Sequence, residues 1–174
     1  MLKIFLLIGT AFMLSLGIVN AQTIQLQERE SIVNVGDDMI DGVFLDINGN
    51  TRLLSEYSGK YILVFFWSSN STGFSPYTFP FQATKDISEL YYNKLTIICI
   101  SIDKEIEWKE VTSKYDILTW VNGRDPLTMR GVFRKYLPSI LPYFVLISPE
   151  NKIVDMWTNR DEELLKSRIS ENMK

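Results

Sequence analysis

The stretch GDDMIDGVFLDINGNTRLLSEYSGKYILVFFW, from Gly36 to Trp67, carries the patterns that decide the fold class. Asn48-Gly49-Asn50 is a turn-forming trio flanked by the short runs Phe44–Asp46 and Thr51–Leu53, and it predicts a β-hairpin. Tyr61–Trp67 is an unbroken apolar and aromatic run. Because such a run has no polar face, it predicts a central strand that is buried on both faces of a sheet.

After this strand, helix and strand patterns alternate. Apolar residues recur at a roughly helical spacing over Pro76–Tyr92, and Leu95–Asp103 is a second fully apolar strand pattern. Glu105–Tyr115 predicts a shorter helix, in which Ile106 and Val111 are the expected inward residues. This alternation is typical of α/β proteins.

The C-terminal third predicts a loop, a hairpin and a closing helix. Asn122-Gly123 and Asp125-Pro126 indicate a loop, and one or two helical turns are expected over Met129–Tyr136. Two apolar runs flank Pro149–Lys152, which predicts a tight hairpin. Asp161 is expected to cap a helix that ends near Met173, with one apolar face formed by Leu164, Leu165 and Ile169. The order of these elements predicts a layered α/β fold with helices on both faces of the sheet.

The N-terminus has the layout of a secretory signal peptide. Lys3 gives a positive start, Ile4–Val19 is apolar without a charge, and the small residue Ala21 precedes Gln22. The alternative is an uncleaved membrane anchor, but this apolar run is shorter than the about 20 residues that a spanning helix needs. We therefore expect residues 1–21 to be a signal peptide that is removed after Ala21, residues 22–33 to be a polar lead-in, and residues 34–174 to form the domain. The expected location is the periplasm or the extracellular space.

The composition excludes several kinds of chemistry. Cys99 is the only cysteine and the chain has no histidine, so an intramolecular disulfide, a histidine-based zinc or copper site and a Ser-His-Asp triad are all excluded. Without Lys3, 17 Lys and Arg face 21 Asp and Glu, and no basic run favours nucleic acid. No metal or other cofactor is expected. Carboxylates near a strand end, such as Asp103, are interpreted as solvated surface.

Three stretches in this order resemble the thioredoxin superfamily, and within it the exported TlpA-like and AhpC/TSA-type thiol-disulfide oxidoreductases. The first is Gly36–Trp67, the second is the loop FFWSSNSTGFSPYTFP over Phe65–Pro80, and the third begins at Ile140-Leu141-Pro142 and continues as YFVLISPENKIV. The resemblance covers nearly all of Asn34–Met173. It implies a thioredoxin-like fold: a central mixed β-sheet, helices on both faces and an N-terminal β-hairpin.

The cysteines of that family are missing from this chain. Members carry the motif FWaxWCxxC, in which the first cysteine lies four residues after the first tryptophan. Counting from Trp67 places the two cysteine positions at Ser71 and Phe74, or at Ser71 and Ser75 if one residue is inserted, and Asn70 replaces the second tryptophan. Neither a serine hydroxyl nor a phenyl ring can carry out thiol-disulfide exchange. The resemblance therefore implies the fold, while the sequence argues against the redox cycle.

The remaining site hypotheses concern a partner rather than a reaction. Ser71 is interpreted as a helix N-cap, because no histidine and no nearby lysine could activate it as a nucleophile. Pro142 matches the cis-proline of the family, beside which an extended peptide pairs with the backbone. The partner groove is expected to involve Trp67, Asn70, Leu141 and Pro142, and Phe74 is expected to be an exposed apolar contact.

Three functions follow from these observations. The first is a redox-inactive, exported thioredoxin-like domain that binds a protein or peptide at the former active-site groove. The second is a thiol-disulfide oxidoreductase or peroxiredoxin-type enzyme that acts through Cys99 or through cysteines of a partner. The third is a structural accessory subunit that uses another surface. Because Cys99 lies among isoleucines in a strand pattern, we expect it to be a buried, unreactive thiol.

Overall fold

The computed structural model describes residues 33–71, 81–114, 120–128, 130–136, 140–158 and 161–173. These ranges belong to the compact unit Ile32–Lys174. The expected signal peptide, and the lead-in apart from Val33, lie outside the described residues. No helix in these ranges is long and apolar enough to cross a membrane.

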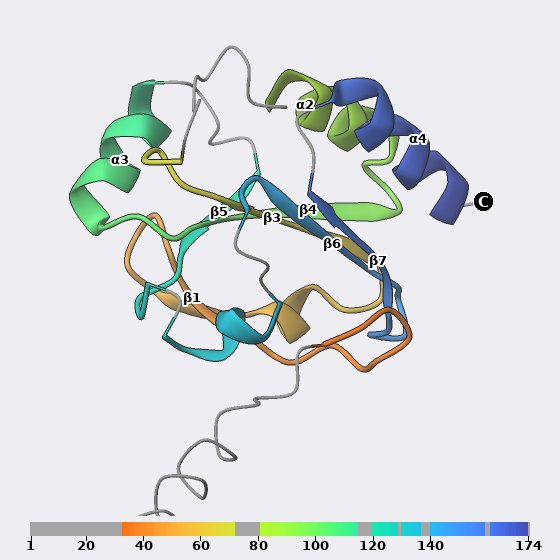
Figure 1. Cartoon of the computed structure of the whole chain (residues 1–174), viewed down its shortest axis with the longest axis horizontal. Coiled ribbons are helices and arrows are strands. Elements are labelled where there is room, and N and C mark those ends of the chain that lie inside the picture. The colour runs from red at the N-terminus through yellow and green to blue at the C-terminus, as the bar shows by residue number, and fades with distance from the viewer. Residues whose placement is uncertain are drawn as a thin grey trace, which may run out of the picture. The chain divides into compact units, whose positions relative to one another are not determined.

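The described residues form a mixed sheet with the strand order β2-β1-β5-β4-β3-β6-β7 (Figure 1). β3 is paired in parallel with β4, and β4 with β5, whereas the other neighbours are antiparallel. The predicted N-terminal hairpin is confirmed, because Val43 pairs with Leu53 across β1 and β2. The strands are β1 (Val43–Asp46), β2 (Thr51–Leu53), β3 (Tyr61–Trp67), β4 (Leu95–Ser101), β5 (Val121–Arg124), β6 (Tyr143–Ile147) and β7 (Ile153–Thr158).

The α-helices cover one face of this sheet (Figure 1). They are α2 (Phe81–Leu90), α3 (Glu105–Lys114) and α4 (Glu162–Asn172). Leu63, Phe65 and Trp67 point from β3 toward this face and form one core with residues of all three helices. Asp161 caps α4 as predicted, because its carboxylate accepts hydrogen bonds from the backbone N–H groups of Glu163 and Leu164 at 2.9 and 3.2 Å.

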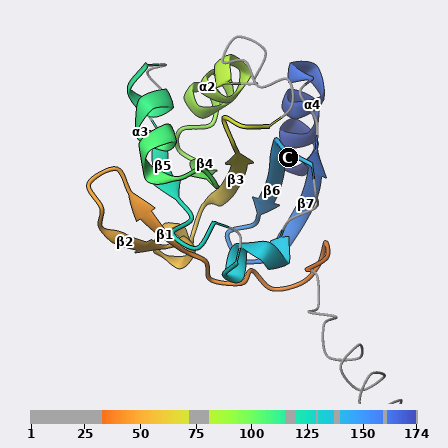
Figure 2. The ribbon, with the colours of Figure 1, turned by 60° about the vertical axis from the view of Figure 1, so that its left-hand side comes forward.

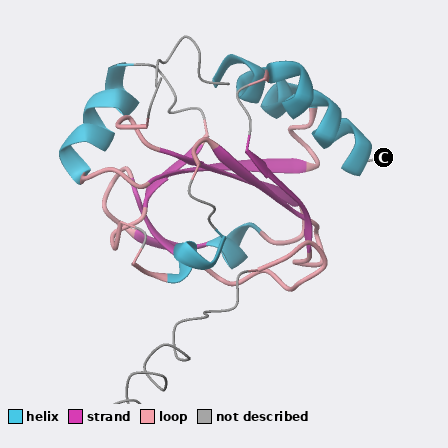
Figure 3. Ribbon diagram, viewed as in Figure 1, coloured by secondary structure: helices cyan, strands magenta, loops and turns pink. Residues whose placement is uncertain are grey.

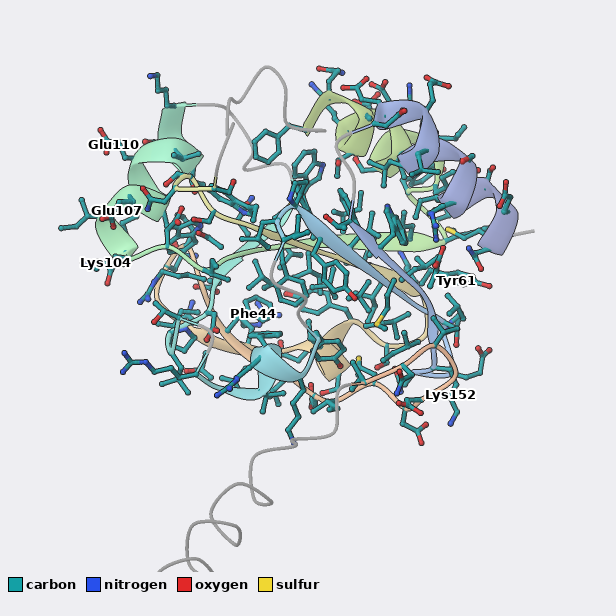
Figure 4. The ribbon with its side chains drawn as sticks, viewed as in Figure 1. Phe44, Tyr61, Lys104, Glu107, Glu110 and Lys152 are labelled. Atoms are coloured by element: carbon teal, nitrogen blue, oxygen red, sulfur yellow. The ribbon has the colours of Figure 1, made fainter. Side chains whose placement is uncertain are left out.

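The opposite face is covered by 3-10 helices instead (Figures 2 and 3). These are η1 (Leu54–Tyr57) and η3 (Val132–Tyr136). Ile62, Val64 and Phe66 alternate from β3 toward them. Phe44 of β1 belongs to the same core and stacks on Tyr57 of η1 with ring centroids 6.4 Å apart (Figure 4). Val33 is buried here as well, and its N–H donates to the Lys135 carbonyl at 3.1 Å. The sequence predicted helices on both faces of the sheet. The structure has α-helices on one face and short 3-10 helices on the other.

The inward face of α3 differs from the prediction. Ile106 is 80% exposed, so its expected burial is wrong, while Val111 is partly buried against the core. Trp108 and Thr112 are the residues that α3 buries. They are four positions apart and so share one face of the helix, and the large Trp108 ring determines which face meets the sheet.

The predicted loop at Asn122-Gly123 is also wrong, because these residues belong to strand β5. Gly123 pairs with Asp46 of β1 and with Ile100 of β4, and a Cβ atom there would lie 2.3 Å from Cδ2 of Phe44. The glycine is therefore explained by the close approach of a buried ring, not by a turn.

We predict that Gly123→Ala lowers the free energy of unfolding by about 1–3 kcal/mol, because the new methyl group overlaps a ring in a closely packed core. The same substitution should be less destabilising in a Phe44→Leu background, where the smaller side chain leaves room. Denaturant unfolding of the two single variants and the double variant measures this coupling. Strictly additive losses would show that the ring contact does not explain the glycine.

Candidate functional site

The candidate site lies where β3 ends and β6 begins. Phe66 pairs with Tyr143 in the antiparallel β3–β6 ladder, so Pro142 lies beside the end of β3 at Trp67. The Leu141–Pro142 peptide bond is cis, and the Pro142 carbonyl accepts a hydrogen bond from the Thr158 hydroxyl at 2.8 Å. The ladder thus brings the Ser68–Ser71 loop and Leu141–Pro142, which are about seventy positions apart in the chain, to one edge of the sheet.

Asp103 holds the loop after β3 in place. It is 4% exposed, and its carboxylate accepts one hydrogen bond from the Ser68 hydroxyl and another from the Ser69 N–H at 2.8 Å. The interpretation of Asp103 as solvated surface is therefore wrong. Because β3 and β4 are parallel, their carboxyl ends meet at the same edge, and this side chain satisfies polar groups that the β3–β4 ladder leaves open.

Local hydrogen bonds complete the loop. The N–H of Ile102 donates to the Trp67 carbonyl at 3.0 Å, and the N–H of Asn70 donates to the Ser68 hydroxyl oxygen at 3.1 Å. Ser71 closes a tight turn, since both its N–H and its hydroxyl donate to the Ser68 carbonyl, at 3.2 and 2.9 Å. The hydroxyl of Ser71 is thus part of the loop's own bonding. The backbone groups that Ser71 was predicted to cap lie outside the described residues.

The expected groove residues differ in exposure. Trp67 is fully buried and packs edge-on against Phe81 with ring centroids 6.0 Å apart, so its side chain offers no surface to a partner. Pro142 is buried, Leu141 is half-buried and Asn70 is exposed. Phe74 and Ser75 lie outside the described residues.

Ile140 is a residue of this site that the sequence reasoning did not single out. It precedes Leu141 directly and is 59% exposed. A signal was present in the sequence, because Ile140 is an apolar residue that lies outside the apolar run of the following strand, Tyr143–Ile147. Together, Ile140 and the half-buried Leu141 give this edge an apolar surface beside the polar Asn70.

Cys99 has no exposed surface. It is fully buried in β4, paired in register with Phe65 on one side and Asn122 on the other. Burial raises the pKa of the Cys99 thiol well above its ordinary value, because the thiolate would lose its hydration. The expectation of a buried cysteine is confirmed. Across the described ranges, no three or more of Cys, Asp and Glu are grouped so as to hold a metal ion.

Comparisons with known proteins identify the fold. No family model matches the sequence, and no curated protein matches it. Among solved structures, a thioredoxin domain of a thiol-disulfide oxidoreductase from Bacteroides vulgatus is 22% identical, with a TM-score of 0.67 over 80% of this chain and 99% of that one. A thiol:disulfide interchange protein from a Bacteroides species is 23% identical, with a TM-score of 0.67 over 82% and 92%.

A third similar structure is a thiol-disulfide oxidoreductase from Bacteroides fragilis, 21% identical, with a TM-score of 0.65 over 78% of this chain and 98% of that one. The mixed sheet with this strand order and the similarity to these solved structures indicate the same fold. The chain therefore has the thioredoxin-like fold that its sequence predicts.

We predict that Asp103→Ala lowers the free energy of unfolding by about 1–3 kcal/mol, because the Ser69 N–H and the Ser68 hydroxyl lose a shared acceptor. Amide hydrogen exchange at Ser69 should become faster. Asp103→Asn keeps an acceptor oxygen and should be less destabilising. Glu110→Ala, which removes a carboxylate from the exposed side of α3, is the matched control and should have little effect (Figure 4). An unchanged exchange rate at Ser69 in Asp103→Ala would contradict this role.

We also predict that Cys99 reacts with an aromatic disulfide reagent only as fast as the protein unfolds. The buried thiol should not react in the folded protein, so labelling should require the unfolded state, in which the thiol has its ordinary pKa of about 8.5. Because only the unfolded thiol ionises in this range, the free energy of unfolding should decrease as the pH rises above about 8.5. Cys99→Ala should remove this contribution. Rapid labelling of the folded protein would contradict the burial.

Proposed function

We propose that the chain is an exported thioredoxin-like domain without redox activity, which binds a protein or peptide partner at the edge formed by Asn70, Ile140 and Leu141. The observation that carries the proposal is the position of the only thiol. Cys99 is fully buried, while Ser71 occupies the position of the family's first cysteine by the count from Trp67.

The chemistry at Ser71 supports the absence of redox activity. Thiol-disulfide exchange requires a thiolate that attacks a disulfide sulfur and a second thiol that resolves the mixed disulfide. Ser71 offers a hydroxyl that donates to the Ser68 carbonyl at 2.9 Å, and the chain contains no histidine that could take its proton. Histidine-assisted nucleophilic catalysis is therefore excluded at this position as well.

The shape and fixation of the edge support binding. Ile140 and Leu141 precede the cis-proline, and in the family that the sequence resembles this backbone pairs with an extended peptide. The opposing loop is held by the buried Asp103, so little conformational freedom remains to be lost when a partner binds. A fixed edge with an exposed apolar side chain at Ile140 is a suitable surface for an extended polypeptide segment.

Two other functions predict different observations. A peroxiredoxin-type or other thiol enzyme acting through Cys99 requires an accessible thiolate, which the burial of Cys99 disfavours. If cysteines of a partner protein completed the redox reaction, that partner would still have to dock at the edge formed by Asn70, Ile140 and Leu141. A structural accessory subunit would use another surface and would tolerate changes at Ile140. Export is part of the proposal because of the expected signal peptide in residues 1–21.

The first test restores the missing chemistry. Ser71→Cys/Phe74→Cys should reduce a disulfide-linked peptide catalytically in the presence of a small thiol, while the unaltered protein should not exceed the background rate. Ser71→Cys/Ser75→Cys tests the alternative register, and Ser71→Cys alone is the control that lacks a resolving thiol. Activity of the unaltered protein would overturn the redox-inactive assignment. A lack of gain in both double variants would show that the site has been remodelled.

The second test concerns the partner edge and uses the active double variant. Ile140→Asp should raise KM for the peptide substrate severalfold, because it removes an exposed apolar contact, and should leave the reaction with a small aromatic disulfide unchanged. Ile106→Asp on α3 is the matched control, since Ile106 is exposed and lies on another element. Equal effects of the two substitutions, or none, would contradict peptide binding at this edge.

A further inference from the structure

The connection between β5 and β6 exposes apolar and basic side chains together. Leu127 is 56% exposed and Val132 is 37% exposed, and both Arg130 and Arg134 are exposed. We call these four residues the basic–apolar patch. η3, which carries Val132 and Arg134, lies on the opposite face of the sheet from α2, α3 and α4 (Figures 1 and 2).

The inner side of η3 is fixed to the core. Phe133 and Tyr136 are 1% exposed, and the Tyr136 hydroxyl donates to the Ile40 carbonyl. The Phe133 ring also lies so close to Gly42 that a Cβ atom there would approach its Cε1 to 2.3 Å. With this inner side anchored, the outward residues of η3 are presented by a rigid support.

The preceding turn is fixed as well. The N–H of Leu127 donates to the carboxylate of Asp125 at 2.9 Å, and Asp125, which is 2% exposed, donates its own N–H to the Ser101 carbonyl at 2.9 Å. The Leu127 side chain lies over Gly131, because a Cβ atom added to Gly131 would be 2.9 Å from Cδ1 of Leu127. The patch is thus preorganised from both ends, which favours its use in recognition.

The charge of this region is unbalanced. No Asp or Glu occurs from Pro126 to Pro149, although the whole chain has a net charge of −3. Within the described residues, no ion pair joins Arg130 or Arg134 to a carboxylate. Carboxylates of the segment that runs to β1 are otherwise engaged: Asp38 pairs with Lys152 at 2.7 Å, and Asp41 accepts from both the N–H and the hydroxyl of Ser55.

We propose that the basic–apolar patch docks a partner protein through an acidic segment in which an apolar side chain lies between carboxylates. The two guanidinium groups are suited to bidentate bonds with carboxylates, and Leu127 and Val132 provide the apolar contact. Arginine is also one of the residue types that are enriched among the residues carrying most binding energy in protein interfaces. This docking is independent of the edge at Ile140 and of the function proposed for it.

An anionic membrane fits the patch less well. Each Lys or Arg near such a surface contributes only about 1 kcal/mol, and stable attachment usually needs a second membrane-binding signal. The patch offers two exposed arginines and two side chains of moderate size, and the neighbouring Lys135 is half-buried. A carboxylate-bearing polypeptide uses the directional bonds of arginine, which a lipid surface does not require.

The test uses a defined probe. The ¹⁵N-labelled protein is titrated with a blocked nonapeptide that consists of Leu-Glu-Glu repeated three times, and amide shifts are followed by NMR. The shifts should be largest over residues 127–136, and the affinity should fall as salt is added. Arg130→Glu/Arg134→Glu should weaken binding at least tenfold, and Leu127→Ser/Val132→Ser severalfold. Lys85→Glu/Lys94→Glu, which makes the same change in charge on α2 and the turn after it, should leave binding unchanged.

Each alternative gives a different result. Equal weakening by the two charge-reversal variants, or shifts centred elsewhere, would mean that binding depends on net charge alone and would overturn the proposal. Binding of phosphatidylglycerol vesicles without binding of the peptide would assign the patch to a membrane instead. Self-association that is lost in Arg130→Glu/Arg134→Glu would assign it to a second copy of this chain. The thermal unfolding of each variant verifies that it is folded.

Discussion

Strand β3 is the element on which the rest of this structure depends. It is hydrogen-bonded in parallel to β4 on one side and in antiparallel to β6 on the other, so it joins the two halves of the sheet. Its residues from Ile62 to Trp67 are all buried, alternately toward the α-helices and toward η1 and η3. Both cores therefore need this strand to remain in one register, because a slip by one residue would exchange its two faces.

The candidate site follows from the same strand. Its carboxyl end delivers Ser68–Ser71, the parallel β4 delivers Asp103, and the antiparallel β6 delivers Leu141–Pro142. Backbone pairing in the sheet brings these segments to one edge, where Asp103 then holds the Ser68–Ser69 loop. The scaffold can therefore persist when the side chains that carry the chemistry are replaced. This is consistent with a thioredoxin-like fold in which serine, not cysteine, occupies position 71.

Close approaches between backbone and aromatic rings pack β1, β5 and η3 together on one side of the sheet. Phe44 fills the space above Gly123, and the Phe133 ring occupies the space next to Gly42. These glycines permit the segment before β1, strand β5 and η3 to pack at short distances. The same packing leaves Val132 and Arg134 pointing outward, so the surface that we propose for an acidic partner is a consequence of how η3 meets the core.

The sequence by itself determined the elements that have a strong local signal. The apolar runs of β3 and β4, the hairpins, the Asp161 cap and the burial of Cys99 were all predicted correctly, because periodicity, turn residues and capping residues act within a few positions of the chain. Tertiary structure alone decided the rest. Asp103 is buried because two parallel strands end side by side, and Ile106 is exposed because Trp108 fixes the orientation of α3. Gly123 lies in a strand because it pairs with both β1 and β4, and Phe44 leaves no room for a side chain there. Each of these outcomes depends on a partner that is distant in sequence or on competition between neighbouring side chains for the core, and a local pattern contains neither.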